Sequence, residues 1–297
     1  MLDVRRLRLL HDLSRLGTIA AVAHLHTYTP SAVSQQLAAL EREAGVALLE
    51  RSGRGVTFTA AGRVLATGAA TVLAALENAE AALAAVVGGL TGPLRIGAYP
   101  SAVRTLLAPA LVALGRDHPG LELRVTELDP VDVPAALHDR DLDVGLLNDY
   151  DVVPAVADPT LDTTPLLDEQ VHLAVGAHDR ADDVGSYRDR DWILAAPGTL
   201  CHTATRQVCA AAGFEPRARH HADDFATVLT LVAAGQGISL VPELAAAQPP
   251  PGVRLIGLTT RRRTRIAYRR GAGARPAIAA FTIALQAAAA EISGESF

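Results

Sequence analysis

The sequence of 297 residues lacks lysine altogether, and it contains only two cysteines and one tryptophan. Two cysteines exclude a small secreted scaffold held together by several disulfide bonds. The amino-terminal residues include four early arginines and no continuous apolar core typical of a signal peptide. The charge-free apolar segment at residues 64–76 has 13 residues, fewer than the roughly 20 that cross a bilayer. We therefore expect a soluble protein that stays in the cytoplasm.

Motifs of common enzyme classes are missing as well. The sequence has no P-loop, no glycine-rich dinucleotide fingerprint, no HExxH motif and no nucleophile elbow. His220–His221 and Asp223–Asp224 form the one cluster that suggests a metal. Successive side chains of a strand point to opposite faces, however, so the two histidines would be separated. We expect no enzyme activity, no cofactor and no metal site.

Residues 18–42 have the pattern of two short helices joined by a tight turn. Thr18 is a suitable N-cap for the first helix, and Thr29 is one for the second. Pro30 then occupies the first helical position, where its missing N–H is not needed. A preceding helix over residues 2–16 has apolar residues at core spacing and is predicted to pack beneath the pair.

The second helix of this pair has two distinct faces. Val33, Leu37 and Leu40 share the apolar face, while the opposite face carries small hydroxyl and amide side chains. Such a face suits close approach to phosphates and base edges in a DNA major groove. An ordinary amphipathic helix with a solvated polar face is the alternative on this pattern alone. The helix residues predicted to contact DNA are Thr29, Pro30, Ser31, Ser34 and Gln35.

Residues 45–62 predict a wing beside this helix. A glycine stop is followed by a short apolar strand, a turn at Ser52–Gly55 and a return strand over residues 56–59. Arg51 and Arg54 flank this turn, where they are suited to hold the sugar-phosphate backbone. Residues 1–59 are therefore predicted to form a winged helix-turn-helix domain that binds double-stranded DNA.

The amino-terminal segment is also the only basic part of the chain. Residues 1–59 carry 7 arginines and 5 acidic residues, whereas the whole chain has 27 and 32 and a net charge of −5. The excess of two positive charges is small. Affinity for DNA would therefore come from the placement of the charges, and from two copies of the domain, more than from bulk charge.

Residues 60–89 predict a long helix ended by Gly88–Gly89. At 1.5 Å per residue it would span roughly 42 Å. Its heptad positions form a continuous apolar seam, which is typical of a dimerising linker helix. A buried helix within one domain is the alternative, but the glycine-rich break at residues 88–93 disfavours it. We expect a homodimer or homotetramer. The seam residues are Leu65, Ala69, Val72, Leu76, Ala79, Leu83 and Val86.

From residue 92 the pattern changes to alternating strands and helices, which predicts an α/β domain with a largely parallel sheet. One lobe would hold residues 92–162 and 266–297, and the other residues 163–265, joined by segments near 160–165 and 260–266. The arginine cluster at 261–270 is predicted to be an exposed strand and turn, and the alternative is that it helps to hold DNA or a partner. The strands are expected at 94–98, 121–128, 143–147, 171–176, 192–196, 217–221, 238–241, 253–258 and 264–268, and the helices at 102–116, 131–139, 201–212, 224–234 and 276–290.

A hinged pair of lobes places a ligand cleft beyond the carboxyl ends of the strands. Helix amino termini at this edge favour an anionic group. The alternative for Ser101 and Thr199 is a helix cap, and for His202 a solvated residue of a first turn. The residues predicted to bind a small-molecule effector are Tyr99, Ser101, Ala102, Asn148, Gly198, Thr199, His202, Phe225, Val241 and Pro242.

The chain resembles LysR-type transcriptional regulators over essentially its full length. The matching amino-terminal motifs are Ala32-Val33-Ser34, Leu40-Glu41, Gly45-Val46, Leu49-Glu50-Arg51 and Thr59-Ala60-Ala61-Gly62, and the matching carboxyl-terminal motifs are Leu142–Leu146, Pro165-Leu166 with Val171–Val175, and Val232–Pro242. Two positions depart from the pattern: Leu49 stands where phenylalanine is common, and Gln35 where a basic residue is common.

The resemblance implies a winged helix-turn-helix, a long linker helix and a two-lobed α/β effector domain similar to periplasmic binding proteins. It further implies that a small molecule in the interdomain cleft changes how the assembly engages its DNA operator. RNA polymerase is the expected partner at the promoter. A solute-binding protein for uptake would share the cleft, but the winged domain argues against it.

Redox sensing is the alternative within the same family, because its peroxide-sensing members carry two cysteines in this region. Here Cys201 and Cys209 are eight residues apart. In a helix their sulfurs would lie more than two turns apart, too far for a disulfide bond without unfolding. We therefore favour control by a ligand.

Overall fold

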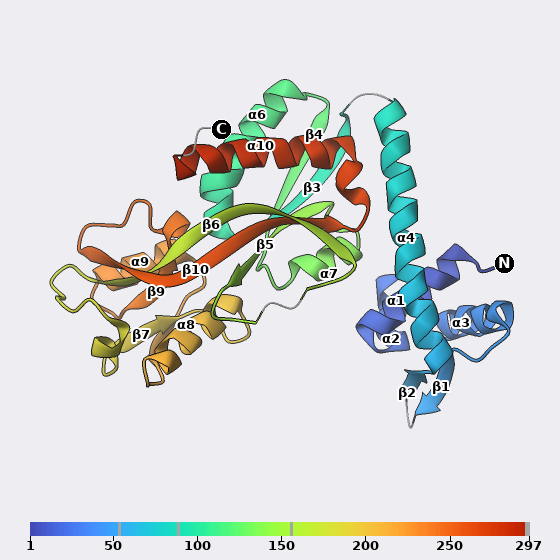
Figure 1. The fold of residues 1–297 in the computed structure, drawn as a ribbon, viewed down its shortest axis with the longest axis horizontal. Helices are drawn as coiled ribbons and strands as arrows, with labels where there is room; N and C mark the ends of the chain where they lie inside the picture. Colours follow the sequence, from blue (N-terminus) through green and yellow to red (C-terminus); the bar gives the residue numbers. More distant parts are fainter. Residues whose placement is uncertain (53–54, 88–89, 155–156, 295–297) are drawn as a thin grey trace. The chain divides into compact units, whose positions relative to one another are not determined.

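The computed structural model describes residues 1–52, 55–87, 90–154 and 157–294. The chain divides into two compact units (Figure 1). Unit 1 consists of residues 1–88 together with 269–275, and unit 2 consists of residues 89–268 together with 276–297.

Unit 1 begins with three short helices whose ends coincide with signals in the sequence. They are α1 (Val4–Leu16), α2 (Ile19–Leu25) and α3 (Pro30–Ala44). Thr18 and Thr29 cap α2 and α3, because their hydroxyls accept a backbone N–H of the first turn. Gly17 and Gly45 follow α1 and α3 with φ of 76° and 71°, a left-handed conformation that glycine adopts without strain. The predicted helix-turn-helix is confirmed.

The wing follows α3 directly. Strand β1 (Leu49–Ser52) pairs antiparallel with β2 (Gly55–Phe58). Glu41 fixes the entry to the wing, because its carboxylate accepts the backbone N–H groups of Leu48 and Leu49 at 2.8 and 3.0 Å. Arg54, in the predicted turn, lies outside the described residues. The core beneath α3 contains Leu7, Leu10, Leu13, Val22, Val33, Leu37, Leu40 and Leu48.

Helix α4 (Ala60–Val87) is the predicted long helix, but its seam is divided. Its first turns complete the core of unit 1, where Ala69 is buried and Leu65 packs against the same cluster. Further along, Leu76 and Leu83 are 36% and 65% exposed. The early seam residues therefore pack in the core of unit 1, whereas the later ones are exposed.

A different face of α4 packs against residues 269–275 in the same unit. Arg269 Nε lies 3.3 Å from Glu77 Oε1, and both side chains are buried. Arg275 Nη2 lies 3.0 Å from Glu80 Oε2. By length and composition alone, residues 60–86 would suffice to cross a membrane, which differs from our expectation based on charge-free segments. The buried ion pair shows that this helix packs against protein.

Unit 2 is built on a mixed sheet. Within the described residues, six strands are ordered β4-β3-β5-β10-β6-β9. β3 is parallel to β4 and β5, but β10 is antiparallel to β5, and β9 is antiparallel to β6. The prediction of a largely parallel sheet was therefore wrong. The strands are β3 (Gly92–Ala98), β4 (Leu121–Glu127), β5 (Val144–Tyr150), β6 (Leu161–Gly176), β9 (Ser239–Pro242) and β10 (Val253–Arg269).

The two long strands, β6 and β10, run through both lobes, as Figure 1 shows. We predicted β10 as two separate strands, at residues 253–258 and 264–268, with three arginines between them. The alternation of faces nevertheless continues through them: Arg261 and Arg263 are exposed, whereas Arg262 is buried. The prediction that the whole cluster is exposed was wrong for Arg262 and Arg269, which are both neutralised by buried glutamates.

Helices cover the sheet and complete the second lobe. α10 (Pro276–Ser293) lies beside α6 (Ala108–Asp117) over the first lobe (Figure 1). The second lobe adds the parallel pair β7 (Asp191–Leu194) and β8 (Arg217–His221). The remaining elements are α5 (Pro100–Ala102), η1 (Val103–Leu107), α7 (Val133–His138), η2 (Val184–Tyr187), α8 (Leu200–Ala211), α9 (Phe225–Ala233), η3 (Glu243–Ala245) and η4 (Ala272–Ala274).

The helix predicted at residues 102–116 changes its winding in the middle. α5, η1 and α6 follow one another without a break, and η1 is a π-helical turn. Pro109 lies at the start of α6 and has no N–H for the carbonyl four residues earlier, so the regular hydrogen-bond ladder cannot continue there.

Candidate functional site

The predicted DNA-contacting residues lie on one exposed face at the start of α3. The side chains of Ser31, Ser34 and Gln35 are exposed. The Thr29 hydroxyl is 3.0 Å from that of Ser31, and Ser34 donates to the Pro30 carbonyl at 2.9 Å. These bonds hold the hydroxyls close to the helix, so the first turn presents a shallow surface that the bases of a major groove can approach.

The wing and the turn before α3 add further exposed groups. Arg51 is exposed on β1, opposite Val56 of β2. Tyr28, which precedes the cap of α3, is 53% exposed and stacks on His26 with ring centroids 6.1 Å apart. We did not predict Tyr28; its signal in the sequence is an aromatic residue placed directly before the N-cap.

The two lobes of unit 2 enclose a cavity of about 310 Å³, which we call the cleft cavity. Half of the predicted effector residues line it: Tyr99, Ser101, Asn148, Thr199 and Phe225. The full lining adds Pro100, Glu127, Leu128, Asp129, Pro130, Cys201, Asp223 and Arg262.

The other five predicted effector residues do not line the cleft cavity. Ala102 is buried in the core, and Val241 and Pro242 pair with β6 in the sheet. His202 uses its backbone N–H to bond the Thr199 hydroxyl at 3.2 Å, so Thr199 caps α8 as well as lining the cavity. Gly198, with φ of 98°, forms the turn before that cap.

A buried arginine lines the cleft cavity. Arg262 is 1% exposed, and its Nε donates to Glu169 Oε1 at 2.9 Å. Its guanidinium carbon is 4.9 Å from the centre of the Tyr99 ring. Burial lowers the pKa of Arg262, but Tyr99 and Glu169 outweigh this effect, so its pKa is raised above the ordinary value. The cation is therefore permanent and already matched by a carboxylate.

Besides Arg262 Nη2, which lies 2.8 Å from Oε1 of its ion-pair partner Glu169, two buried polar atoms at the cavity have no hydrogen-bond partner within the described part of the chain. They are Ser101 Oγ and Asn148 Oδ1, and their residues are 3% and 9% exposed. Buried polar groups are nearly always paired, and leaving one unpaired costs roughly 1–3 kcal/mol. Both atoms are thus suited to bond a ligand in the cavity.

Acidic side chains line the same cavity. In the first lobe, Glu127 ends β4 and Asp129 follows it, and in the second lobe Asp223 precedes α9. Burial raises the pKa of Asp129. The hydrogen bond from the Val131 N–H lowers this pKa, but the negative charges of Asp132 and Asp223 raise it further. We missed this group because Asp223 is far from Glu127 and Asp129 in the sequence.

An ion pair joins the lobes beside the cavity. Arg104 Nη2 of η1 lies 2.8 Å from Asp224 Oδ1, the residue that also caps α9. Both side chains are partly exposed, which makes this contact a weak one that solvent can replace. It holds the lobes together without fixing them.

The thiol of Cys201 also faces the cleft cavity. Its Sγ is 3.1 Å from the Tyr150 hydroxyl, and burial raises its pKa above the ordinary value. Cys209, deeper in α8, has a pKa raised to about 12 by burial and by the charge of Glu215. Neither thiol is therefore in its reactive thiolate form near neutral pH.

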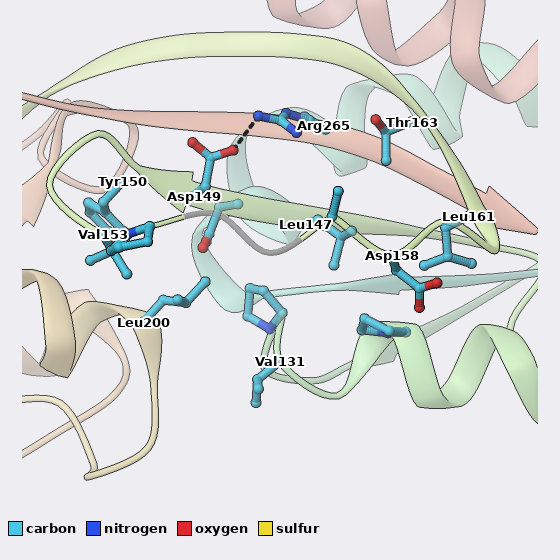
Figure 2. A pocket seen from close by; sticks show the side chains of 15 residues that line it. Val131, Leu147, Asp149, Tyr150, Val153, Asp158, Leu161, Thr163, Leu200 and Arg265 are labelled. Atoms are coloured by element: carbon cyan, nitrogen blue, oxygen red, sulfur yellow. Dashed lines mark ion pairs between the residues drawn. The ribbon is translucent and has the colours of Figure 1, made fainter. Parts of the chain in front are cut away.

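A second cavity of about 380 Å³ adjoins the first, and the two share Pro130 and Asn148. Figure 2 shows its apolar wall, with Leu147 between Leu161 on one side and Leu200 on the other. Asp149 and Arg265 form an ion pair of 2.6 Å at its edge. This second cavity extends the space beside the cleft with a mostly apolar surface.

Two family models match the chain. Residues 4–63 match the bacterial regulatory helix-turn-helix protein of the lysR family, and residues 87–290 match the LysR substrate binding domain. The chain is 29% identical over 255 residues to the probable transcriptional regulator LrrA of Synechococcus elongatus, covering 85% of each protein. It is 32% identical over 251 residues to a probable hydrogen peroxide-inducible genes activator of Mycobacterium avium, covering 78% of this chain and 79% of that protein.

Solved structures of full-length regulators have the same fold. An OxyR mutant of Corynebacterium glutamicum matches with a TM-score of 0.59 and 27% identity, covering 100% of this chain and 96% of that one. Full-length BenM matches with a TM-score of 0.56 and 22% identity over 99% of each chain, a likeness in fold alone.

Proposed function

Because the chain belongs to the LysR family of transcriptional regulators, we propose that a small molecule in the cleft cavity controls how its winged domains engage an operator. The observation that carries this proposal is the pair of buried, unpartnered atoms, Ser101 Oγ and Asn148 Oδ1, in a cavity formed by both lobes. A ligand that bonds both lobes favours one lobe arrangement, and it shifts the equilibrium by its difference in affinity for the two.

On the DNA side, we propose that Thr29, Pro30, Ser31, Ser34 and Gln35 approach bases and phosphates in the major groove. Arg51 and Arg54 of the wing would contact the backbone beside it. Phosphate contacts position a protein without reading sequence, whereas the amide of Gln35 can pair with a base edge. Gln35 is therefore the proposed selective contact, and Arg51 the general one.

The proposed assembly is a homodimer, or a homotetramer, formed through the later seam of α4. Leu76 and Leu83 expose apolar surface along one face of that helix, which supports burial against a second copy. A dimer also brings two winged domains to one operator. The second domain adds to the DNA affinity, which compensates for the small positive charge of each domain. We place the protein in the cytoplasm, acting with RNA polymerase.

Thiol-based redox sensing is a second candidate, since Cys201 lines the cleft cavity beside Tyr150. The relative from Mycobacterium avium is named a hydrogen peroxide-inducible genes activator. Against it, Cys201 and Cys209 are eight residues apart in α8, a rise of roughly 12 Å. Disulfide-bonded residues have Cα atoms within about 7 Å, so α8 would have to unwind first.

The test is a footprint of the purified full-length protein on the DNA that flanks its own gene, repeated with candidate metabolites. We expect a protected operator whose footprint changes length or position with one class of metabolite. Protection that responds to hydrogen peroxide, and to no metabolite, would instead support the thiol candidate.

A further inference from the structure

The cleft cavity has an acidic lining that its own cation does not neutralise. Glu127, Asp129 and Asp223 all face it, and within the described residues none of them forms an ion pair. Arg262, the arginine in the same lining, already pairs with Glu169. The cavity is therefore electrically negative, and a ligand with positive charge would relieve this imbalance.

The two uncharged, unpartnered oxygen atoms of the cavity can also accept hydrogen bonds from a ligand. Asn148 Oδ1 accepts hydrogen bonds and cannot donate, and the Ser101 hydroxyl is able to do either. Both are more than nine-tenths buried and unpartnered within the described residues. Together with the carboxylates, they offer acceptors from four separate segments toward one space: α5, β5, the end of β4 and the turn before α9.

We propose that the effector is a small organic cation, a primary amine whose ammonium group lies between Asp129 and Asp223. This proposal rests on the proposed function, since it names the chemistry of the molecule that fills the effector cavity. Further N–H or O–H groups of the amine would bond Asn148 and Ser101, and its carbon chain would lie against Tyr99 and Phe225. The cavity of about 310 Å³ has the volume of roughly ten waters, enough for a molecule of about ten non-hydrogen atoms.

The position of the two aspartates explains how such a ligand would act on the lobes. Asp129 belongs to the first lobe and Asp223 to the second, so their like charges oppose closure. An ammonium group between them converts this repulsion into two attractions. An anion would add a further negative charge to the cavity. A cationic ligand therefore replaces our expectation of an anionic one, and the first-turn N–H of His202 in α8 already donates to the Thr199 hydroxyl.

The experiment is calorimetric titration of the full-length protein at low salt with 1,4-diaminobutane. Succinate and 1,4-butanediol serve as an anionic and a neutral probe of the same chain length. We expect the diamine to bind and the other two to bind at least tenfold more weakly. Asp129→Asn and Asp223→Asn should each weaken diamine binding about tenfold or more, because each removes a charge partner of the ammonium. Ser101→Trp should abolish it by filling the cavity.

Asp132→Asn is the matched control, since Asp132 lies near Asp129 but outside the cavity lining. It should change diamine affinity less than about twofold, as expected for a charge without direct contact. Absence of diamine binding, stronger binding of succinate, or equal effects of the Asp132 and Asp129 variants would each overturn the proposal.

Failure of the amine assignment is distinguishable from failure of the proposed function. If succinate binds, is excluded by Ser101→Trp and changes the operator footprint, the cavity is an effector site and only the amine class is wrong. If molecules that bind the cavity leave the footprint unchanged, the proposed function itself is wrong.

Discussion

Replacing Glu169 by glutamine should destabilise the effector domain far more than the same kind of change one residue earlier. Glu169 is 2% exposed, and its carboxylate accepts Arg262 Nε at 2.9 Å and the Leu244 N–H at 2.6 Å. Glu169→Gln keeps the size of the side chain but leaves Arg262 as a buried charge without its counter-ion. Breaking a buried pair in this way costs roughly 3–5 kcal/mol.

Asp168→Asn is the internal control. Asp168 pairs with Arg261, the neighbour of Arg262, but the two side chains are 53% and 47% exposed. Exposed pairs contribute about 0–1 kcal/mol. Two adjacent ion pairs on the same two strands therefore differ in burial. The structure predicts that breaking the buried pair lowers the free energy of unfolding severalfold more than breaking the exposed pair.

Thermal unfolding followed by tryptophan fluorescence measures this difference directly. Trp192 is the only tryptophan of the chain and is buried in β7, so its emission reports on the effector domain. For a domain of about 200 residues, 1 kcal/mol corresponds to roughly 2–4 °C. We expect Glu169→Gln to lower the melting temperature by about 6–20 °C and Asp168→Asn by less than about 4 °C. Equal shifts for the two variants would refute the assignment of Arg262 as a buried, permanently paired cation.

Two further predictions concern DNA binding and assembly. In gel-shift titrations, Arg51→Ala should weaken binding to all operators about equally, by roughly tenfold, because a phosphate contact is lost. Gln35→Ala should instead change the preference among operator sequences. Unchanged affinity of the Arg51→Ala variant would count against the wing as a DNA contact. Leu76→Asp should place a charge in the exposed seam of α4 and halve the mass seen by sedimentation, since an unpaired buried charge costs several kcal/mol. Thr71→Asp, exposed on the same helix but outside the seam, should leave the mass unchanged; if Leu76→Asp also leaves it unchanged, α4 is not the interface.

The helix ends of unit 1 could be predicted because their signals are local. Thr18 and Thr29 each act on an N–H within three residues, and Gly17 and Gly45 supply a backbone conformation that few other residues adopt. Such signals need no knowledge of the rest of the fold. The early seam of α4 was less predictable, because an apolar helix face does not tell whether its own domain or a partner will cover it.

The cleft cavity could be predicted only in part, because its polar lining depends on contacts between distant residues. Arg262 pairs with Glu169, 93 residues away, and a run of arginines gives no hint that the middle one is buried. Asp129 and Asp223 come together from different lobes. By contrast, Ser101 and Asn148 follow the strands predicted at 94–98 and 143–147, a position that points to a ligand edge in many α/β folds.

Control of the operator complex by a ligand in the cleft cavity is tested most directly by comparing two variants. Ser101→Trp fills the cavity, and the double variant Cys201→Ser with Cys209→Ser removes both thiols. In a reporter assay with parallel operator gel shifts, we predict that Ser101→Trp binds the operator but no longer responds to the effector, whereas the double serine variant responds normally. A double serine variant that loses its response while Ser101→Trp keeps it would contradict the account and assign control to the thiols.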